Sequence, residues 1–187
     1  MSVTATNALS ALTGTYVLDA SHSRLGFIAR HAMITKVRGS FNTYEGKATI
    51  NGAEPNSSTL SVTIDTASID TREAARDQHL KSADFFDVEQ FPTITFVGTS
   101  FNIVDDSTVE VTGDLTIKGV SRPVTIPFEF GGSAQDPFGN QRIGFEGSVT
   151  INRKDWGLTW NAVLETGGVL VGEKIVIELE VSAIKEA

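Results

Sequence analysis

Residues 109–130 read VEVTGDLTIKGVSRPVTIPFEF, and apolar side chains occupy every second position through most of this stretch. A period of two places alternate side chains on opposite faces of an extended chain, so it predicts half-buried β-strands rather than helices. Similar but less regular runs lie at about 24–33, 37–50, 58–65, 93–104, 142–152 and 174–184. The chain is therefore expected to be all-β, with about eight or nine antiparallel strands.

Strands in this number must close into a barrel or divide into a two-sheet sandwich, because open strand edges promote association with other chains. Several of the runs are long, and glycines lie inside them at Gly39, Gly98, Gly113 and Gly144. A barrel wall needs bends or bulges at such positions. We therefore expect a closed barrel, with a sandwich as the alternative.

Composition limits the classes of function. The 187 residues fit one domain, and the formal net charge of −8 without a basic run argues against nucleic acid as a partner. The absence of cysteine excludes disulfides and cysteine-based metal sites. No stretch has the length of a membrane span, and the first residues lack the charged and apolar regions of a secretory signal, so we expect a cytoplasmic protein. Residues 1–14 are expected to form a loose tail ahead of a single domain over 15–187.

About twenty-seven residues separate the predicted strands that end near Asp65 and begin at Thr93, far more than a hairpin needs. Asp70 and Glu73 form a plausible capping box, so a short helix is predicted over 71–81, with a second turn beginning at Ser82. The adjacent Phe85 and Phe86 need apolar surface to pack on. The mouth of the barrel offers such a surface, so 71–90 is expected to lie there.

Five blocks of the sequence resemble the YceI family of lipocalin-like proteins over about residues 15–184. They are DxxHSRLGFIARH, VRGSF, SID followed by TREAARDQHLKSADFFDVEQFPTITF, then GDLTIKGVSRPV, and GFEGSVTINRKDWG. The resemblance implies an extended eight-stranded antiparallel barrel with a helical segment. It also implies that an apolar chain, such as a polyisoprenoid or a related lipid, lies inside the barrel.

Candidate ligand contacts follow from the strand faces and from the predicted mouth. His31 and Met33 share a face with Phe27, which points them inward; His31 is either a satisfied core histidine or a contact to a ligand head group. Arg76 and His79 could hold an anionic head, or they could belong to a solvated helix face with local ion pairs. The full set of predicted contacts is Phe27, His31, Met33, Phe41, Arg76, His79, Leu80, Phe85, Phe86, Phe96, Trp156 and Leu158.

The favoured function is a non-enzymatic carrier of a lipophilic molecule, without metal or cofactor. His22 and His31 are an odd number of residues apart, which separates them onto opposite faces of an unbroken strand and argues against a three-histidine zinc site. Two alternatives are an enzyme acting on the lipid with His79 or His31 as general base, and an interaction domain whose barrel is filled by its own side chains. A homodimer is a further option that the sequence leaves open.

Overall fold

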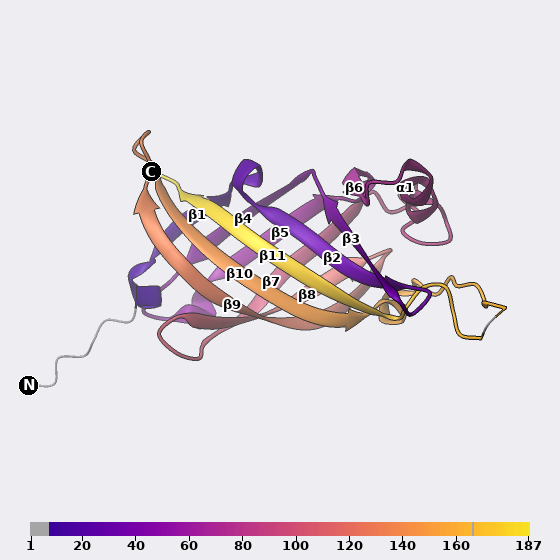
Figure 1. Cartoon of the computed structure of the whole chain (residues 1–187). Helices are drawn as coiled ribbons and strands as arrows, with labels where there is room; N and C mark the ends of the chain where they lie inside the picture. The colour runs from indigo at the N-terminus through magenta and orange to yellow at the C-terminus, as the bar shows by residue number, and fades with distance from the viewer. Residues whose placement is uncertain (1–7, 166) are drawn as a thin grey trace, which may run out of the picture.

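The computed structural model describes residues 8–165 and 167–187. In this part of the chain eleven strands form one antiparallel sheet, accompanied by a single α-helix, α1 (Ala74–Lys81). Figure 1 shows an elongated barrel with the C-terminus at one end and α1 at the other. The strands are β1 (Gly14–Leu18), β2 (Arg24–His31), β3 (Thr35–Phe41), β4 (Tyr44–Ile50), β5 (Thr59–Asp65), β6 (Ile69–Asp70), β7 (Thr93–Ile103), β8 (Thr108–Ile117), β9 (Val120–Gln135), β10 (Gln141–Asn152) and β11 (Lys174–Lys185).

Strand β11 closes the barrel with two different partners. Its middle, from Val176 to Glu180, pairs with β2, and its end, from Ala183 to Lys185, pairs with β1. Strands β1 and β2 therefore share the position next to β11. Their other partners, β4 for β1 and β3 for β2, share the position after that. With β5 and β6 sharing a third position, the eleven strands make an eight-stranded barrel. The expected barrel is confirmed, and the sheet does not divide into a sandwich.

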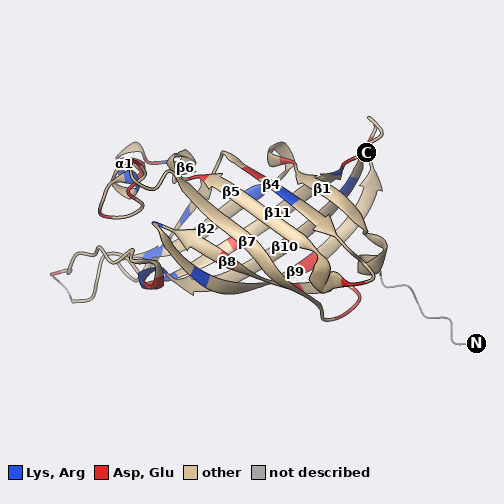
Figure 2. Ribbon diagram, turned by 180° about the vertical axis from the view of Figure 1, so that it is seen from behind, with Lys and Arg blue, Asp and Glu red and all other residues tan. Residues whose placement is uncertain are grey.

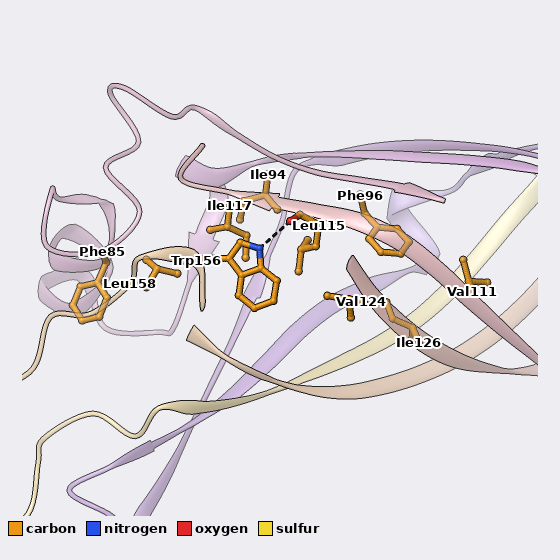
Figure 3. Packing of buried hydrophobic residues seen from close by; sticks show 10 residues of the cluster. All are labelled: Phe85, Ile94, Phe96, Val111, Leu115, Ile117, Val124, Ile126, Trp156 and Leu158. Carbon is orange, nitrogen blue, oxygen red and sulfur yellow. Dashed lines mark hydrogen bonds between the residues drawn. The ribbon is translucent and has the colours of Figure 1, made fainter. Parts of the chain in front are cut away.

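The inward face is apolar, as the alternation predicts. Val111, Leu115 and Ile117 of β8 and Val124 and Ile126 of β9 are buried in one cluster, shown in Figure 3. On the outside of the same strand pair, the hydroxyl groups of Thr112 and Thr125 are 2.8 Å apart. Strands β8 and β9 therefore each have one face toward the apolar interior and one face toward solvent.

The glycines inside the strands have two different uses. The ladder shifts register beside Gly98 and beside Gly144, which confirms the expected bulges there. Gly39 instead lies under the ring of Phe27 on the paired strand, where a Cβ atom would come within 2.3 Å of the ring. Gly113 makes the same room for Phe96, with a Cβ position 2.5 Å from the ring. These two glycines accommodate inward aromatic rings rather than bends.

The N-terminal segment departs from the expected loose tail over residues 8–13. Ala8–Ala11 form the 3-10 helix η1, and Leu9 and Leu12 are only 4% and 7% exposed. The two leucines pack at the barrel end opposite α1, beside Tyr16, Ile143 and Ala183. Burial of apolar surface against the barrel orders this segment. Residues 1–7 of the predicted tail lie outside the described residues.

The predicted helix begins three residues later than expected. Its N-cap is Glu73, whose carboxylate accepts from the amide of Ala75 at 3.4 Å, and α1 starts at Ala74. Asp70 does not join a capping box, because its Oδ1 accepts from the amide of Arg72 at 2.9 Å. Arg72 has a φ of 68°, which lies outside the helical region.

Candidate ligand-binding cavity

The barrel encloses a cavity of about 370 Å³. This volume lies in the range of small-molecule sites, roughly 300–1,000 Å³. Inward side chains of all eight strand positions line it, from Leu9 and Leu12 at one end to Leu80 and Phe85 at the other. The space therefore runs along the barrel axis.

The wall of the cavity is apolar almost throughout. Within the described residues no Asp, Glu or His lines it, and its two charged residues are Lys47 and Arg153. The Nζ of Lys47 pairs with a carboxylate oxygen of Glu186 at 3.3 Å, so its charge is balanced at the rim. The other polar contributors are Tyr16, Asn51, Ser58 and Thr59. Burial raises the pKa of the Tyr16 hydroxyl, which keeps this group neutral.

Arg153 is 4% exposed, and its guanidinium group donates to backbone oxygens. It follows β10 in the 3-10 helix η5 (Arg153–Trp156). Its Nε bonds the carbonyl of Gly172 at 2.9 Å, and Nη1 bonds those of Leu158 and Trp160 at 2.5 and 3.0 Å. Its Nη2 donates to Val171 at 3.2 Å. Burial lowers the pKa of Arg153, an effect that the charge of Glu173 opposes.

These bonds tie together the two ends of the connection between β10 and β11. The described residues 157–165 and 167–173, called the exit loop below, project from the α1 end of the barrel in Figure 1. Arg153 accordingly holds the base of the exit loop and is not available to bind an anionic head group.

Trp156, the last residue of η5 before the exit loop, lines the cavity at its α1 end. It is 3% exposed, and its indole Nε1 donates to the carbonyl of Leu115 at 2.8 Å, as the dashed line in Figure 3 marks. Leu158, 5% exposed, follows it along the chain. The left-handed Gly157 between them, with a φ of 79°, allows the chain to turn.

The segment 71–92, called the lid below, covers the mouth with aromatic rings. Phe85 is 6% exposed and belongs to the main core cluster. Phe86 lies edge-on to Phe41 of β3 with ring centroids 6.0 Å apart, and Phe41 in turn contacts Phe27. Both phenylalanines of the lid line the cavity, and so does Leu80.

A group of three rings joins the lid to the exit loop. His79 packs edge to face on Trp160 and on Phe85, with centroid separations of 4.5 and 5.1 Å. Phe85 and Trp160 are 5.4 Å apart. The Nε2 of His79 is 2.8 Å from Oδ2 of Asp84, which fixes the plane of the imidazole. His79 is thus a contact between two covering segments and does not line the cavity.

Arg76 points away from the cavity and fastens the start of the lid. Its Nε donates to Oγ1 of Thr71 at 2.8 Å, and its Nη2 donates to the Thr71 carbonyl at 2.7 Å. Asp77 accepts from the amide of Thr71 at 2.9 Å. Thr71 is 3% exposed, so these bonds anchor the lid in the core.

Eight of the twelve predicted contacts line the cavity, and four do not. His31 and Met33 are wrong as inward residues: β2 ends at His31, Met33 is 66% exposed, and both side chains lie outside the cavity. Arg76 and His79 serve the lid instead, as described above. The residues that line the cavity are Phe27, Phe41, Leu80, Phe85, Phe86, Phe96, Trp156 and Leu158.

Sequence reasoning missed the far end of the cavity and the role of Arg153. Leu9 and Leu12 have helical spacing in a segment rich in Thr, Ser and Ala, a signal that was too short to separate from a tail. The contact of Arg153 with four loop carbonyls has no local sequence pattern.

The described residues contain no group of three or more His, Cys, Asp or Glu side chains placed to hold a metal ion. Among the described helices, none is long and apolar enough to cross a bilayer.

Comparison with known proteins agrees with this geometry. Residues 16–183 match the model of the YceI-like domain. The chain belongs to the YceI family. Among curated relatives, a UPF0312 protein of Staphylococcus aureus (strain MSSA476) is 42% identical over 87% of this chain and 93% of its own length. A UPF0312 protein of Ectopseudomonas mendocina (strain ymp) is 40% identical over 80% of this chain and 79% of its own length.

Solved structures of other proteins share the barrel fold. The Campylobacter jejuni YceI protein is similar with a TM-score of 0.70 and 31% identity over 84% of this chain and 90% of its own. Burkholderia cenocepacia BcnA gives a TM-score of 0.77 at 22% identity, covering 88% and 98% of the two chains. A domain from Saccharophagus degradans described as polyisoprenoid binding gives 0.70 at 16% identity, covering 91% and 98%. The last two show the fold alone.

Proposed function

We propose that this YceI-family protein binds a lipophilic long-chain molecule inside the barrel and carries or sequesters it. The observation that carries the proposal is the long cavity with an apolar wall, covered at one end by the lid and at the other by η1. A polyisoprenoid, an isoprenoid quinone or a fatty-acid-like lipid has the required shape. The Saccharophagus degradans domain, described as polyisoprenoid binding, supports this class of ligand.

Desolvation supplies the binding free energy in such a site. Each CH₂ group transferred from water to the cavity contributes about 0.8 kcal/mol. The middle of the cavity, lined by residues such as Phe96, Val111 and Ile126, has no group that could pair with a polar head. An unpaired polar group there would cost several kcal/mol, on the order of 2–7. The head group of the ligand is therefore expected at one of the two ends.

Binding is favoured over catalysis by the ionisable groups of the wall. Lys47 is ion-paired at the rim, and Arg153 is engaged by four carbonyl groups. His79 and His31, the bases that an enzyme would require, do not line the cavity. General acid–base catalysis needs such a group within hydrogen-bond reach of the substrate.

Native mass spectrometry with lipid extraction of the purified protein tests the proposal. A Val111→Phe variant fills part of the cavity, whereas Val97→Phe makes the same change at a valine that is 49% exposed. We expect bound lipid in the unchanged protein and shorter or less bound lipid in Val111→Phe only. Overpacking costs about 1–3 kcal/mol, so both variants must first be shown to be folded. Conversion of added lipid would favour an enzyme, and a protein that neither retains nor takes up lipid would favour a filled interaction domain.

A further inference from the structure

The tip of the β2–β3 hairpin exposes two large aliphatic side chains beside the covered mouth. Met33 is 66% exposed and Ile34 is 79% exposed. The turn is closed by the amide of Ile34, which donates to the carbonyl of His31 at 3.1 Å. Ala32 and Met33, in the three-residue loop between the paired His31 and Thr35, have φ values of 50° and 62°, a left-handed conformation that hairpin turns normally give to Asn or Gly. A strained turn therefore holds these apolar side chains in water.

The exit loop continues this apolar surface. The amide of Ala32 donates to the carbonyl of Leu170 at 2.7 Å, and His31 forms a β-bridge with Val171. Val163 is bridged to Val169 in the same loop and is 85% exposed. Met33, Ile34 and Val163, called the apolar tip below, thus project from two segments that are hydrogen-bonded to one another.

The outer face of the hairpin is basic, and the hairpin itself carries no Asp or Glu. Phe27 and Ala29 line the cavity, so the alternate residue Arg30 points outward. Arg30 is paired across the ladder with Lys36, and Arg38 lies two residues further along β3 on the same face. All three are exposed. Like charges placed opposite each other in a sheet destabilise it.

Ion pairing does not relieve this repulsion. None of Arg30, Lys36 and Arg38 takes part in a salt bridge within the described residues, and the only hydrogen bond of the Arg30 side chain there runs from Nη1 to the carbonyl of Ile34, at 3.3 Å. The sequence contains no Asp or Glu from residue 20 to residue 44. In Figure 2, Lys and Arg segments lie on the barrel end from which the exit loop extends.

We propose that the apolar tip and the basic hairpin face form a docking surface for an anionic lipid bilayer, beside the lid through which ligand exchanges. Aliphatic side chains enter the boundary between head groups and acyl chains, while Arg30, Lys36 and Arg38 meet the lipid phosphates. The lid carries five Asp and Glu residues against Arg72, Arg76 and Lys81, a net charge of −2, so the molecule would dock on its hairpin side with α1 turned away. The role of this surface in ligand exchange rests on the proposed lipid carriage.

A bilayer fits these observations better than a second copy of the chain would. Two basic hairpin faces repel each other, and a symmetric dimer would bring them together. The net charge of −8 also opposes binding to anionic membranes by any other face. Docking is accordingly expected to depend on this one surface.

Vesicle flotation of the lipid-loaded protein tests the surface. Vesicles of phosphatidylcholine alone are compared with vesicles containing about a quarter phosphatidylglycerol. Ile34→Asp removes part of the apolar tip, and its control is Phe138→Asp, a change at an 87% exposed ring at the other end of the barrel. Lys36→Gln removes one basic charge, and Lys185→Gln, an exposed lysine near the C-terminus, is its control.

Binding is expected only to the anionic vesicles, and it should weaken at high salt. Ile34→Asp should reduce it at least about tenfold, and Lys36→Gln about fivefold, with both controls unchanged. Equal binding to neutral vesicles, absence of binding, or equal effects of Ile34→Asp and Phe138→Asp would each overturn the proposal. A dimer in light scattering that Ile34→Asp dissociates would assign the surface to a second copy instead.

Lipid content separates this proposal from the proposed function. Native mass spectrometry of the same variants without vesicles should show unchanged bound lipid, because neither Ile34 nor Lys36 lines the cavity. Retained lipid without vesicle binding would refute docking alone. Vesicle binding by a protein that takes up no lipid would refute carriage alone.

Discussion

The imidazole of His79 lies against the indole of Trp160 with ring centroids 4.5 Å apart and ring planes at 85°. His79 belongs to the helix of the lid, and Trp160 belongs to the exit loop. Both rings also touch Phe85, which lines the cavity. Opening of either covering segment must therefore break contacts among these three rings.

Removal of Trp160 is expected to speed the release of bound lipid. Trp160 is half-buried and its indole forms no hydrogen bond in the described structure, so Trp160→Ala should cost less stability than a core truncation. An aromatic pair contributes about 0.5–1.5 kcal/mol beyond its buried area, and two pairs are lost here. Transfer of a fluorescent lipid from the protein to acceptor vesicles measures the rate. Phe138→Ala, at an exposed ring far from the lid, is the control; equal rates in both variants would show that the ring group does not restrain the lid.

The buried Phe85 and the partly buried Phe86 of the lid should affect ligand retention more than a buried residue of the barrel wall does. Phe85→Ala and Phe86→Ala each open apolar volume at the mouth, whereas Leu115→Ala opens it inside the wall. Truncation of a buried phenylalanine costs about 3–5 kcal/mol, and of a buried leucine about 2–5 kcal/mol. Lipid off-rates should be compared at equal folded fraction. If all three variants release lipid at the same rate, the lid phenylalanines serve only as packing.

Most of the fold could be predicted from the alternation of apolar and polar residues, because this pattern depends only on neighbouring residues in the sequence. Val111 and Leu115 point inward for the same reason that Thr112 points outward: alternate side chains of a strand lie on opposite faces. The same rule misplaced Met33, since the alternation runs on into a turn, and it misplaced His31, which is the last residue of β2 and lies beyond the cavity. The three loop residues Ala32, Met33 and Ile34 give no sign of a turn, because hairpin turns with positive φ usually contain Asn, Asp or Gly.

The ends of the cavity depend on contacts between distant parts of the chain. Leu9 packs near Ile143 and Ala183, and Trp156 donates to the carbonyl of Leu115. No sequence period relates such pairs. The position of the lid was predictable because Phe85 and Phe86 needed an apolar surface, but the uses of Arg76 and His79 were set by Thr71 and Trp160.

Replacement of Arg153 by methionine should destabilise the protein and loosen the exit loop. Methionine replaces the unbranched stem of the side chain but removes the guanidinium donor from four carbonyl groups, of which, within the described residues, only that of Val171 keeps another donor, the side-chain amide nitrogen of Asn161. An unsatisfied buried polar group costs about 1–3 kcal/mol, so a loss of at least about 3 kcal/mol is expected in urea unfolding. Hydrogen exchange should accelerate most at Leu170 and Gly172, whose amides bond other backbone carbonyls in this region. Unchanged exchange there would mean that the loop is held by other contacts.

At the opposite end of the barrel, one arginine holds two carboxylates. The Nη1 of Arg142 donates to Oδ2 of Asp19 at 2.7 Å, and its Nε donates to Oδ2 of Asp136 at 2.8 Å. Hydrogen bonds from Ser21 and then from Arg142 hold the pKa of Asp19 well below its usual range. The bond from Arg142 lowers the pKa of Asp136 to about 2.

This network should make stability depend on pH in the acid range. A carboxylate whose pKa is lower in the folded than in the unfolded state stabilises the fold above its unfolded value, about 3.9, and that contribution is lost as pH falls through the folded value. Stability should therefore decline between about pH 4 and pH 2. In Arg142→Gln both folded pKa values rise toward the unfolded value, so the decline should be shallower. Arg122→Gln is the matched control, because Arg122 bonds only the backbone carbonyl of Asp155. The measurement is the urea midpoint of unfolding across this pH range. Equal slopes of the midpoint against pH in the two variants would place the acid sensitivity elsewhere. Asp105 is one such site, because bonds from the amides of Ser107 and Thr108 lower its pKa.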